Sequence, residues 1–219
     1  MAQHLLRDLE NLKKEILLLG SMVEDSTNKA LLALTDDRAD LVEEVVKGDR
    51  AVDDKEIQVE EECLKILALH QPVATDLRYV VAVMKVNNDL ERVGDLAGNI
   101  ASRAKKLAEL GQSLDVPSDI QEMGNRVRTM LRESLNAMIH LDTDLARKVL
   151  KDDDDVDARH KHIYEEIQHR MEASPQHIAG LMNLLSVSRY LERIADLATN
   201  IAEDVVFMVD GDVVRHQSW

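Results

Sequence analysis

The chain has 219 residues, of which 32% are charged and only 2% are aromatic, and its formal net charge is −15. Three prolines and eight glycines are too few for the frequent turns of an all-β protein, so we expect an all-α fold. The negative charge opposes binding to nucleic-acid phosphates or anionic lipids, and it favours cations and basic protein surfaces as partners.

Cysteine usage and hydropathy indicate a cytoplasmic protein. The single cysteine, Cys63, excludes an internal disulfide, and its place in an apolar stripe predicts that it is buried. The N-terminal residues lack the basic-then-apolar order of a signal peptide. The longest apolar run, residues 79–84, is too short to span a membrane. We therefore expect neither membrane insertion nor nucleic-acid binding.

Apolar residues recur at helical spacing and predict six helices. We place these at residues 4–46, 50–69, 75–110, 118–150, 154–172 and 175–209. Gly48 follows the first long run and marks its end, and Pro72 separates the second helix from the third. Ser174 and Pro175 have the N-cap and N1 order that begins a helix. The segment 111–118 predicts a linker between two halves of three helices each.

Four consecutive aspartates, residues 152–155, lie at the predicted start of the fifth helix. Acidic side chains just before and inside a first turn interact favourably with the positive end of the helix dipole, which is the simpler interpretation. A dedicated binding role for the run is the alternative.

The third and sixth predicted helices carry nearly the same segment. LERVGDLAGNIA begins at Leu90, and LERIADLATNIA begins 101 residues later at Leu191. Such a repeat indicates that the chain was built from two copies of one supersecondary unit. The sequence therefore predicts two tandem, pseudo-symmetric three-helix bundles, at residues 1–112 and 113–211, followed by a frayed tail at 212–219.

Within each copy of this segment, Glu, Asp and Asn recur at every fourth residue and so lie along one side of a helix. At about 100° per residue, Val93 and Ala97 fall on the core face, whereas the acidic side lies away from the core. Like charges at this spacing destabilise a helix slightly, so their repetition suggests that a cation offsets the repulsion. Small residues flank the acidic side and allow a neighbouring helix to approach: Gly94, Gly98, Ala195 and Thr199.

The second helix of each copy supplies further donors beside this face, because acidic residues border its apolar stripe. A groove between the second and third helices would gather oxygen ligands that suit magnesium, manganese, calcium or iron. The alternative is an ordinary solvated helix face. His160 stands opposite Glu56 of the first copy, and there we expect the two sites to differ. The candidate metal ligands are Glu91, Asp95, Glu192, Asp196, Asp53, Asp157, Asn99, Asn200, Asp49, Asp153 and His160.

These segments resemble the PhoU family of phosphate-uptake regulators over almost the whole chain. The matching stretches are GDRAVDDKEIQVEEEC, QPVATDLRYVV, NNDLERVGDLAGNIA and SRYLERIADLATNIAED. The resemblance implies two symmetric three-helix bundles with iron or zinc at surface sites built from the duplicated E-x-x-x-D motifs. Carried onto this chain, those motifs are Glu91 with Asp95 and Glu192 with Asp196, and Asp53 and Asp157 are supporting ligands.

The resemblance also implies a role and partners. Such a protein would be cytoplasmic, homodimeric and without an established enzymatic activity. It would negatively control the phosphate-starvation response by linking the phosphate ABC transporter, through a PstB-like ATPase, to a PhoR-like sensor histidine kinase. One alternative is a carboxylate-based metalloenzyme or metal-storage protein, and another is a structural interaction module whose metal is incidental. No Ser-His-Asp or Cys-His arrangement that would support nucleophilic catalysis stands out.

Two stretches set the copies apart. Ala195 stands where the family's second motif more often has Gly, which bears on helix approach rather than on metal binding. The stretch from Gln71 to Arg78 has no counterpart in the second copy. It is either a partner contact or a loop closure.

Overall fold

Each helix of the chain buries one apolar stripe against its neighbours, and this burial determines the architecture. The computed structural model describes residues 2–36, 38–111 and 114–211. It confirms the all-α fold, because no strand occurs in the described part of the chain. The elements are α1 (Ala2–Thr35), α2 (Ala39–His70), α3 (Ala74–Glu109), α4 (Ser118–His140), α5 (Thr143–Ala173), the 3-10 turn η1 (Pro175–His177) and α6 (Ile178–Asp210).

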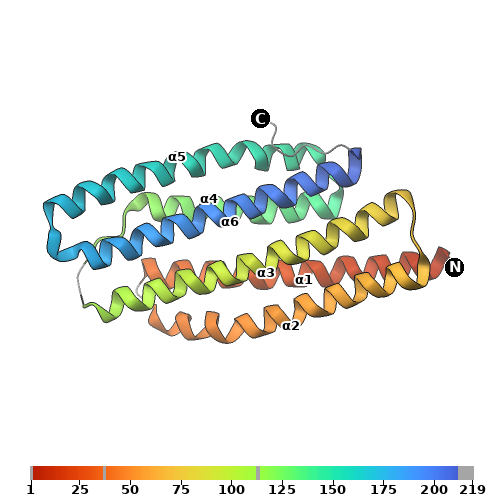
Figure 1. The fold of residues 1–219 in the computed structure, drawn as a ribbon, viewed down its shortest axis with the longest axis horizontal. Helices are drawn as coiled ribbons and strands as arrows, with labels where there is room; N and C mark the ends of the chain where they lie inside the picture. The colour runs from red at the N-terminus through yellow and green to blue at the C-terminus, as the bar shows by residue number, and fades with distance from the viewer. Residues whose placement is uncertain (1, 37, 112–113, 212–219) are drawn as a thin grey trace.

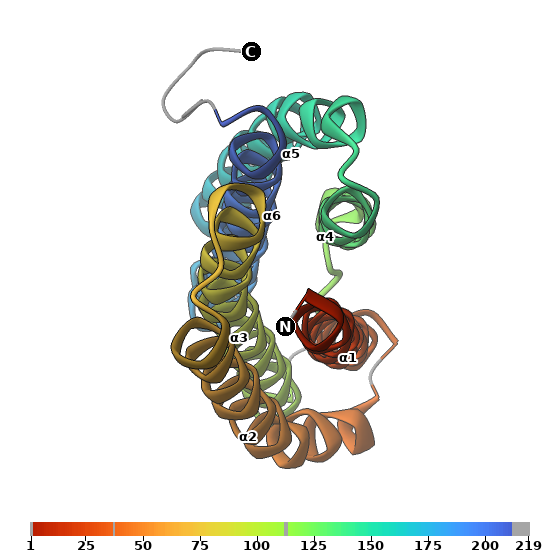
Figure 2. The same cartoon turned by 90° about the vertical axis from the view of Figure 1, so that its right-hand side faces the viewer.

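Three helices pack together in each half, and the halves join mainly along α3 and α6. In the first half α1, α2 and α3 contact one another, as α4, α5 and α6 do in the second (Figure 1). Seen from the end, α2, α3, α6 and α5 form a curved layer, and α1 and α4 lie on its inner side (Figure 2). The predicted pair of three-helix bundles is confirmed, and α2–α3 and α5–α6 are neighbours in the outer layer.

The residues predicted to face inward form the core. Val93, Ala97 and Ile100 of α3 are fully buried, and their counterparts in α6 are buried in the same way. Cys63 is buried on α2, as predicted. Each large apolar side chain taken from water contributes about 1.5–3 kcal/mol. These stripes therefore fix which side of each helix faces outward.

The first connection lies earlier than predicted. α1 ends at Thr35 rather than at residue 46, and α2 begins at Ala39 rather than at residue 50. Gly48 therefore lies inside α2, and the prediction that it ends a helix is wrong. A glycine within a helix costs about 1 kcal/mol relative to alanine, which burial of the apolar stripe on both sides of it outweighs.

The equivalent connection in the second half also lies earlier than predicted. α4 ends at His140, and α5 begins at Thr143. The Asp142 side chain caps α5 by accepting a hydrogen bond from the Leu145 N–H at 2.9 Å. Residues 152–155 therefore lie in the middle of α5, and the prediction that they begin a helix is wrong.

The connections at the prolines agree with the sequence signals. Pro72 lies between α2, which ends at His70, and α3, which begins at Ala74. Pro175 begins the short 3-10 turn that leads into α6. Proline ends a helix at these points because it cannot donate the hydrogen bond that would continue the preceding turn.

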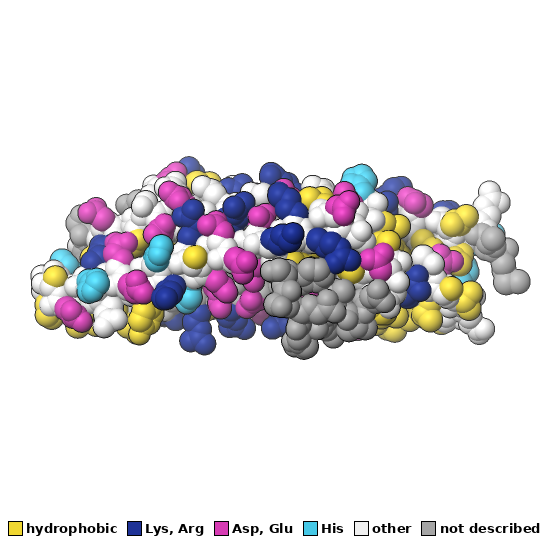
Figure 3. All heavy atoms as spheres, turned by 90° about the horizontal axis from the view of Figure 1, so that it is seen from above, with side chains coloured by type: hydrophobic (Ala, Val, Ile, Leu, Met, Phe, Trp, Pro, Cys, Tyr) yellow, Lys and Arg dark blue, Asp and Glu magenta, His cyan; other side chains and the backbone are white. Residues whose placement is uncertain are grey.

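The surface over α5 carries charges of both signs. Figure 3 looks onto this face and shows acidic and basic side chains interspersed. Within the described ranges, no helix is both long and apolar enough to cross a lipid bilayer. The predicted tail at residues 212–219 lies outside the described residues.

Candidate functional site

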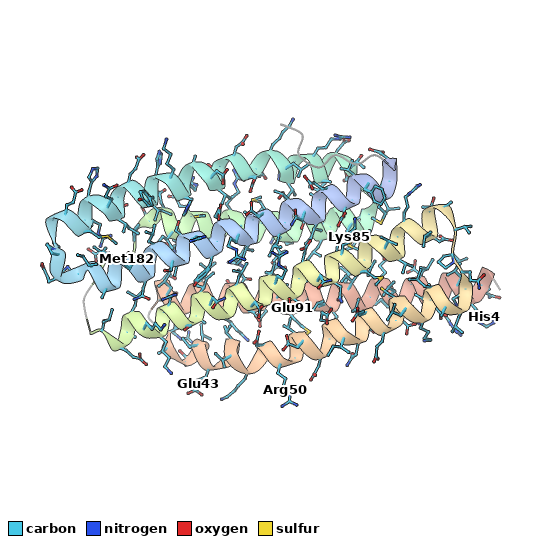
Figure 4. All side chains as sticks on the ribbon, viewed as in Figure 1. His4, Glu43, Arg50, Lys85, Glu91 and Met182 are labelled. Carbon is cyan, nitrogen blue, oxygen red and sulfur yellow. The ribbon has the colours of Figure 1, made fainter. Side chains whose placement is uncertain are left out.

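The E-x-x-x-D motif of the first half lies on the side of α3 that faces α2. Glu91 is partly buried on this side (Figure 4), and Asp95, one turn later, is exposed. Gly94 lets the two helices approach, because a Cβ added there would lie 3.2 Å from Val52 Cγ1 on α2. The same addition at Gly98 would meet no atom within 4 Å. The predicted close approach therefore occurs at Gly94 and not at Gly98.

Four carboxylates from α2 and α3, those of Asp49, Asp53, Glu91 and Asp95, share the space between these helices, here called the α2–α3 groove. Burial raises the pKa of Asp49, and the negative charges of Asp53 and Asp95 raise it further. Burial also raises the pKa of Glu91, with Asp95 and then Asp53 adding to the shift. Asp49 and Glu91 therefore ionise against burial and against the negative charge of their neighbours, and a cation beside them would favour their charged forms.

The second half repeats this arrangement between α5 and α6 with Asp153, Asp157, Glu192 and Asp196, here called the α5–α6 groove. Burial, followed by repulsion from Asp157 and Asp196, raises the pKa of Asp153 from 3.8 to about 7. Burial and then Asp196 raise the pKa of Glu192, whereas His160 opposes that shift. Burial and then Asp157 raise the pKa of Asp196. The electrostatic coupling joins both helices into one acidic site.

The four consecutive aspartates of α5 divide between two environments. Asp152 and Asp155 face α4, where Arg126 lies 3.7 Å and 3.2 Å from their carboxylates. Burial pushes the pKa of Asp155 up, but hydrogen bonds from Arg126 and Arg159 outweigh it and lower that pKa. Asp153 is coupled to the α5–α6 groove instead. Successive side chains of a helix are rotated by about 100° around its axis. Asp152 and Asp155 therefore lie toward α4, and Asp153 lies toward the α5–α6 groove.

The groove carboxylates lie beside one another without a basic side chain between them. None of the eight pairs with a Lys, Arg or His side chain in the described part of the chain. Elsewhere, pairs such as Lys148 with Glu133 at 2.6 Å are common. Basic side chains act on the α5–α6 groove from its margin, where Arg193 opposes the rise in the pKa of Asp196.

A hydrogen bond between helices lies at the upstream end of each groove. In the first half, Asn87 Nδ2 donates to the backbone oxygen and to Oε1 of Glu56, both at 3.0 Å. In the second half, His160 Nδ1 lies 2.7 Å from Ser188 Oγ. Sequence reasoning did not single out Asn87 or Ser188. Each lies four residues before the glutamate of its motif, so the spacing that revealed the motif also extends to them.

The donor set fits a metal ion in its chemistry. Carboxylate oxygens, with an imidazole in the second half, are the side chains that bind divalent and transition metals. Among the residues that the structure describes, no three His, Cys, Asp or Glu side chains converge closely enough to hold one ion. Carboxylates without a cation repel one another. Binding would therefore require the exposed side chains Asp53, Asp95, Asp157 and Asp196 to turn inward.

The two motif asparagines lie at the margins of the grooves. Asn99 is exposed on α3. Asn200 lines a cavity of about 300 Å³ between α3 and α6, together with Arg92, Arg193 and Asp196. Asn200 therefore borders the seam between the two halves.

The stretch from Gln71 to Arg78 is part loop and part helix. Gln71 and Ala74 have φ angles of 46° and 49°, in the left-handed region that non-glycine residues seldom adopt. Arg78 Nε donates a hydrogen bond to the backbone oxygen of Met208 at 3.2 Å. Through this bond the stretch closes the end of the first half onto α6, while a contact with a partner stays a prediction.

Comparison with known proteins gives a consistent result. A model of the PhoU domain matches the chain twice, at residues 16–104 and 120–205. The chain is 37% identical over 216 residues to the phosphate-specific transport system accessory protein PhoU homolog of Pseudomonas aeruginosa, covering 99% of this chain and 89% of that protein. The homolog from Aquifex aeolicus is 38% identical, with 97% and 96% covered. The Escherichia coli protein of this type is 31% identical, with 95% and 86% covered.

Solved structures share the fold as well. The crystal structure of PhoU from Pseudomonas aeruginosa superposes with a TM-score of 0.91 at 37% identity, over 94% of this chain and 99% of that one. The phosphate transport system regulatory protein PhoU from Streptococcus pneumoniae gives a TM-score of 0.89 at 30% identity, over 96% and 99%. The chain belongs to the PhoU family.

Proposed function

We propose that this protein is a metal-binding regulatory adaptor that holds the phosphate-starvation response off while phosphate is plentiful and modulates phosphate uptake. Its relatives are named as accessory or regulatory proteins of phosphate transport, which supports the regulatory part. In this role the protein is a cytoplasmic homodimer that links the ATPase of the phosphate ABC transporter to a sensor histidine kinase. It passes the activity state of the transporter to the kinase and does not itself catalyse a reaction.

The observation that carries the metal-binding part is the electrostatic coupling of clustered carboxylates in each acidic groove. Burial and mutual repulsion raise the pKa of Glu91 in one groove and of Glu192 in the other. A bound cation would offset the repulsion among these carboxylates. Glu91 and Asp95 would hold it against Asp49 and Asp53, and their counterparts in the second half would do the same. The bound cation would thereby hold α2 against α3 in the first half and α5 against α6 in the second.

Cells that lack the protein test the regulatory proposal. In phosphate-rich medium, they are expected to express phosphate-scavenging genes such as a secreted phosphatase, and the wild-type gene is expected to restore repression. Unchanged expression in the deletion strain would contradict the adaptor role. The double variant E91Q/E192Q is expected not to restore repression, whereas E165Q, which changes an exposed glutamate outside both grooves, is expected to restore it.

The proposed partners and the proposed homodimer are tested by separate measurements. Pull-down with the purified protein is expected to retain the transporter ATPase and the histidine kinase from a lysate of phosphate-replete cells. Light scattering on the eluted protein is expected to give twice the mass of the 24.7 kDa chain. A monomer at micromolar concentration would contradict the homodimer while leaving the adaptor role to be decided by gene expression.

One observation favours a second function, that of a metalloenzyme or metal-storage protein. Asp153 has its pKa raised to about 7, which is a suitable value for a general base at neutral pH. Purified protein that hydrolyses a phosphoester or oxidises Fe²⁺, and loses this activity in the variant D95A/D196A, would support catalysis. No turnover with metal-loaded protein would support the adaptor.

A further inference from the structure

The first half contains a cavity at the end where α2 begins and α3 finishes, here called the end cavity. Its volume is about 370 Å³, and helices α1, α2 and α3 all line it. Small-molecule sites in proteins are clefts of about 300–1,000 Å³ with mostly apolar walls and a few polar groups. The apolar walls of the end cavity are Ala33, Ala39, Val42, Ala104 and Ala108. Its size and lining therefore fit a small ligand.

The second half carries larger apolar side chains at the equivalent positions. The third helices correspond at an offset of 101 residues, which aligns Ala104 with Val205 and Lys105 with Val206. Val205 is 1% exposed and Val206 is fully buried, whereas Lys105 is exposed at the edge of the end cavity. The end cavity therefore depends on side chains of the first half that the repeat does not share.

An ion pair spans the equivalent place in the second half. Arg147 Nη2 on α5 lies 3.5 Å from Oδ2 of Asp210 on α6. At the offsets of 104 for the second helices and 101 for the third, these residues correspond to Glu43 and Glu109. Both counterparts are acidic, so they repel each other and cannot form that pair. The repeat has thus replaced a bridge between two helices by two carboxylates.

These carboxylates lie at the opening of the end cavity. Glu43 and Glu109 line it and are both exposed, and Figure 4 labels Glu43 near the start of α2. Lys47 lies 3.1 Å from Glu43 on the surface of α2 itself, and such an exposed pair contributes little. With Lys105, the opening carries two negative charges and one positive charge. It therefore favours a positively charged group over a negative one.

We infer that the end cavity binds a small amphiphilic cation, an apolar molecule that carries an ammonium group. Its apolar body packs against the alanine and valine side chains, and its ammonium group donates hydrogen bonds to Glu43 and Glu109. Such hydrogen bonds between charged groups are stronger than neutral ones. The ligand supplies the positive charge that Arg147 supplies in the second half. This inference is independent of the proposed metal binding, because it uses neither acidic groove.

Nuclear magnetic resonance of the full-length protein with ¹³C-labelled alanine methyl groups tests this inference. Octylamine is the probe, and octanoate is its match with the opposite charge. Octylamine is expected to shift the methyl signals of Ala33, Ala39, Ala104 and Ala108 in a saturable way. Octanoate is expected to bind roughly tenfold more weakly or not at all, since it lacks the charged hydrogen bonds.

Two variants transfer residues of the second half to the first. E43R introduces the counterpart of Arg147, which is expected to pair with Glu109 and to weaken octylamine binding roughly tenfold or more. A104V introduces the counterpart of Val205 and is expected to weaken binding by narrowing the end cavity. The control E165R makes the same charge reversal at an exposed glutamate of α5 and is expected to leave binding unchanged.

Three outcomes would overturn the inference. The first is that millimolar octylamine leaves the four alanine signals unshifted. The second is that octanoate binds as tightly as octylamine, which would assign the opening to Lys105 and an anion. The third is that E43R binds octylamine like the wild type. Because Glu43 is exposed, E43R is expected to fold normally by circular dichroism, so it decides the matter even where A104V is unstable.

Discussion

Gly124 of α4 lies directly beneath Leu31 of α1. A Cβ added at Gly124 would approach both terminal methyl groups of Leu31 to 2.8 Å. The repeat makes the same contact a second time with the partners exchanged, because a Cβ at Gly20 of α1 would lie 2.6 Å from a methyl group of Leu135 on α4. Two glycine–leucine contacts thus set the distance between α1 and α4.

This contact predicts coupled effects on stability. G124A is expected to lower the free energy of unfolding by about 1 kcal/mol, since overpacking costs about 1–3 kcal/mol and the gain in helix propensity returns about 1 kcal/mol. In an L31A background, where the methyl groups are gone, the same change is expected to be neutral or stabilising. A double-mutant cycle by urea denaturation measures the coupling, which additive effects would contradict.

The α3–α6 seam predicts a second effect on stability. Lys85 Nζ on α3 lies 2.8 Å from Oδ1 of Asp204, a buried carboxylate on α6, and Figure 4 shows Lys85 at this seam. K85M is expected to lower the free energy of unfolding by about 1.5–3 kcal/mol, because it removes a charged hydrogen bond from a buried acceptor. K47M is the matched control, since among the described residues Lys47 pairs only with Glu43, on an exposed face of its own helix. Its cost is expected to stay below about 0.5 kcal/mol, and equal costs would contradict the argument.

The pKa of Asp153 predicts how stability depends on pH in the metal-free protein. Burial raises this pKa from 3.8 to about 7, so between these values the folded state holds a proton that the unfolded state has lost. The corresponding stabilisation is present at low pH and disappears as pH rises through 7. In chelator, the melting temperature is expected to fall between pH 5 and pH 8.

A substitution at Asp153 isolates its contribution to that slope. D153N cannot ionise and is expected to flatten the decline over the same interval. D54N changes an exposed carboxylate on α2 outside the grooves, and it is expected to keep the wild-type slope. A decline of equal steepness in D153N would assign the pH dependence to other groups. Circular dichroism melts across the pH series provide the measurement.

Metal addition is expected to raise stability through the groove carboxylates. A ligand that binds only the folded state at a hundredfold excess over its Kd stabilises by about 2.7 kcal/mol. Mn²⁺ and Zn²⁺ are therefore expected to raise the melting temperature of the chelator-treated protein. E91Q/E192Q removes one ligand from each groove and is expected to abolish most of this increase. An increase of the same size in the double variant would place the bound ions elsewhere.

The helices and their core-facing sides could be predicted from the sequence, but not all of the helix boundaries could. Val93 and Ala97 are buried where helical spacing placed them, because burial of an apolar stripe dominates the packing of a long helix. The connection at residues 36–38 reads Asp-Asp-Arg and carries neither glycine nor proline, so nothing in it outweighed Gly48 as a boundary signal. In the second half Asp142 is a regular N-cap residue, but the acidic run at residues 152–155 carries a stronger helix-start pattern.

The candidate site was predictable only in part. Residue spacing shows on which side of its helix a side chain lies, but it does not show which residue of a neighbouring helix that side chain contacts. Spacing placed Glu91 and Asp95 on one outward side. It could not show that Asn87 reaches Glu56, since that contact depends on the crossing of α2 and α3. Nor could it show that Asp153 faces α6 while Asp152 pairs with Arg126, because the true start of α5 decides the rotation of both.

The paired contacts Gly20–Leu135 and Gly124–Leu31 give the junction between the halves the form of a two-fold interface. Each half brings the same glycine and the same leucine, so one surface serves both sides, as in a symmetric dimer of identical subunits. Joining the halves in one chain makes their association independent of protein concentration. It also frees the two halves from being identical, so that Glu56 in one half can correspond to His160 in the other.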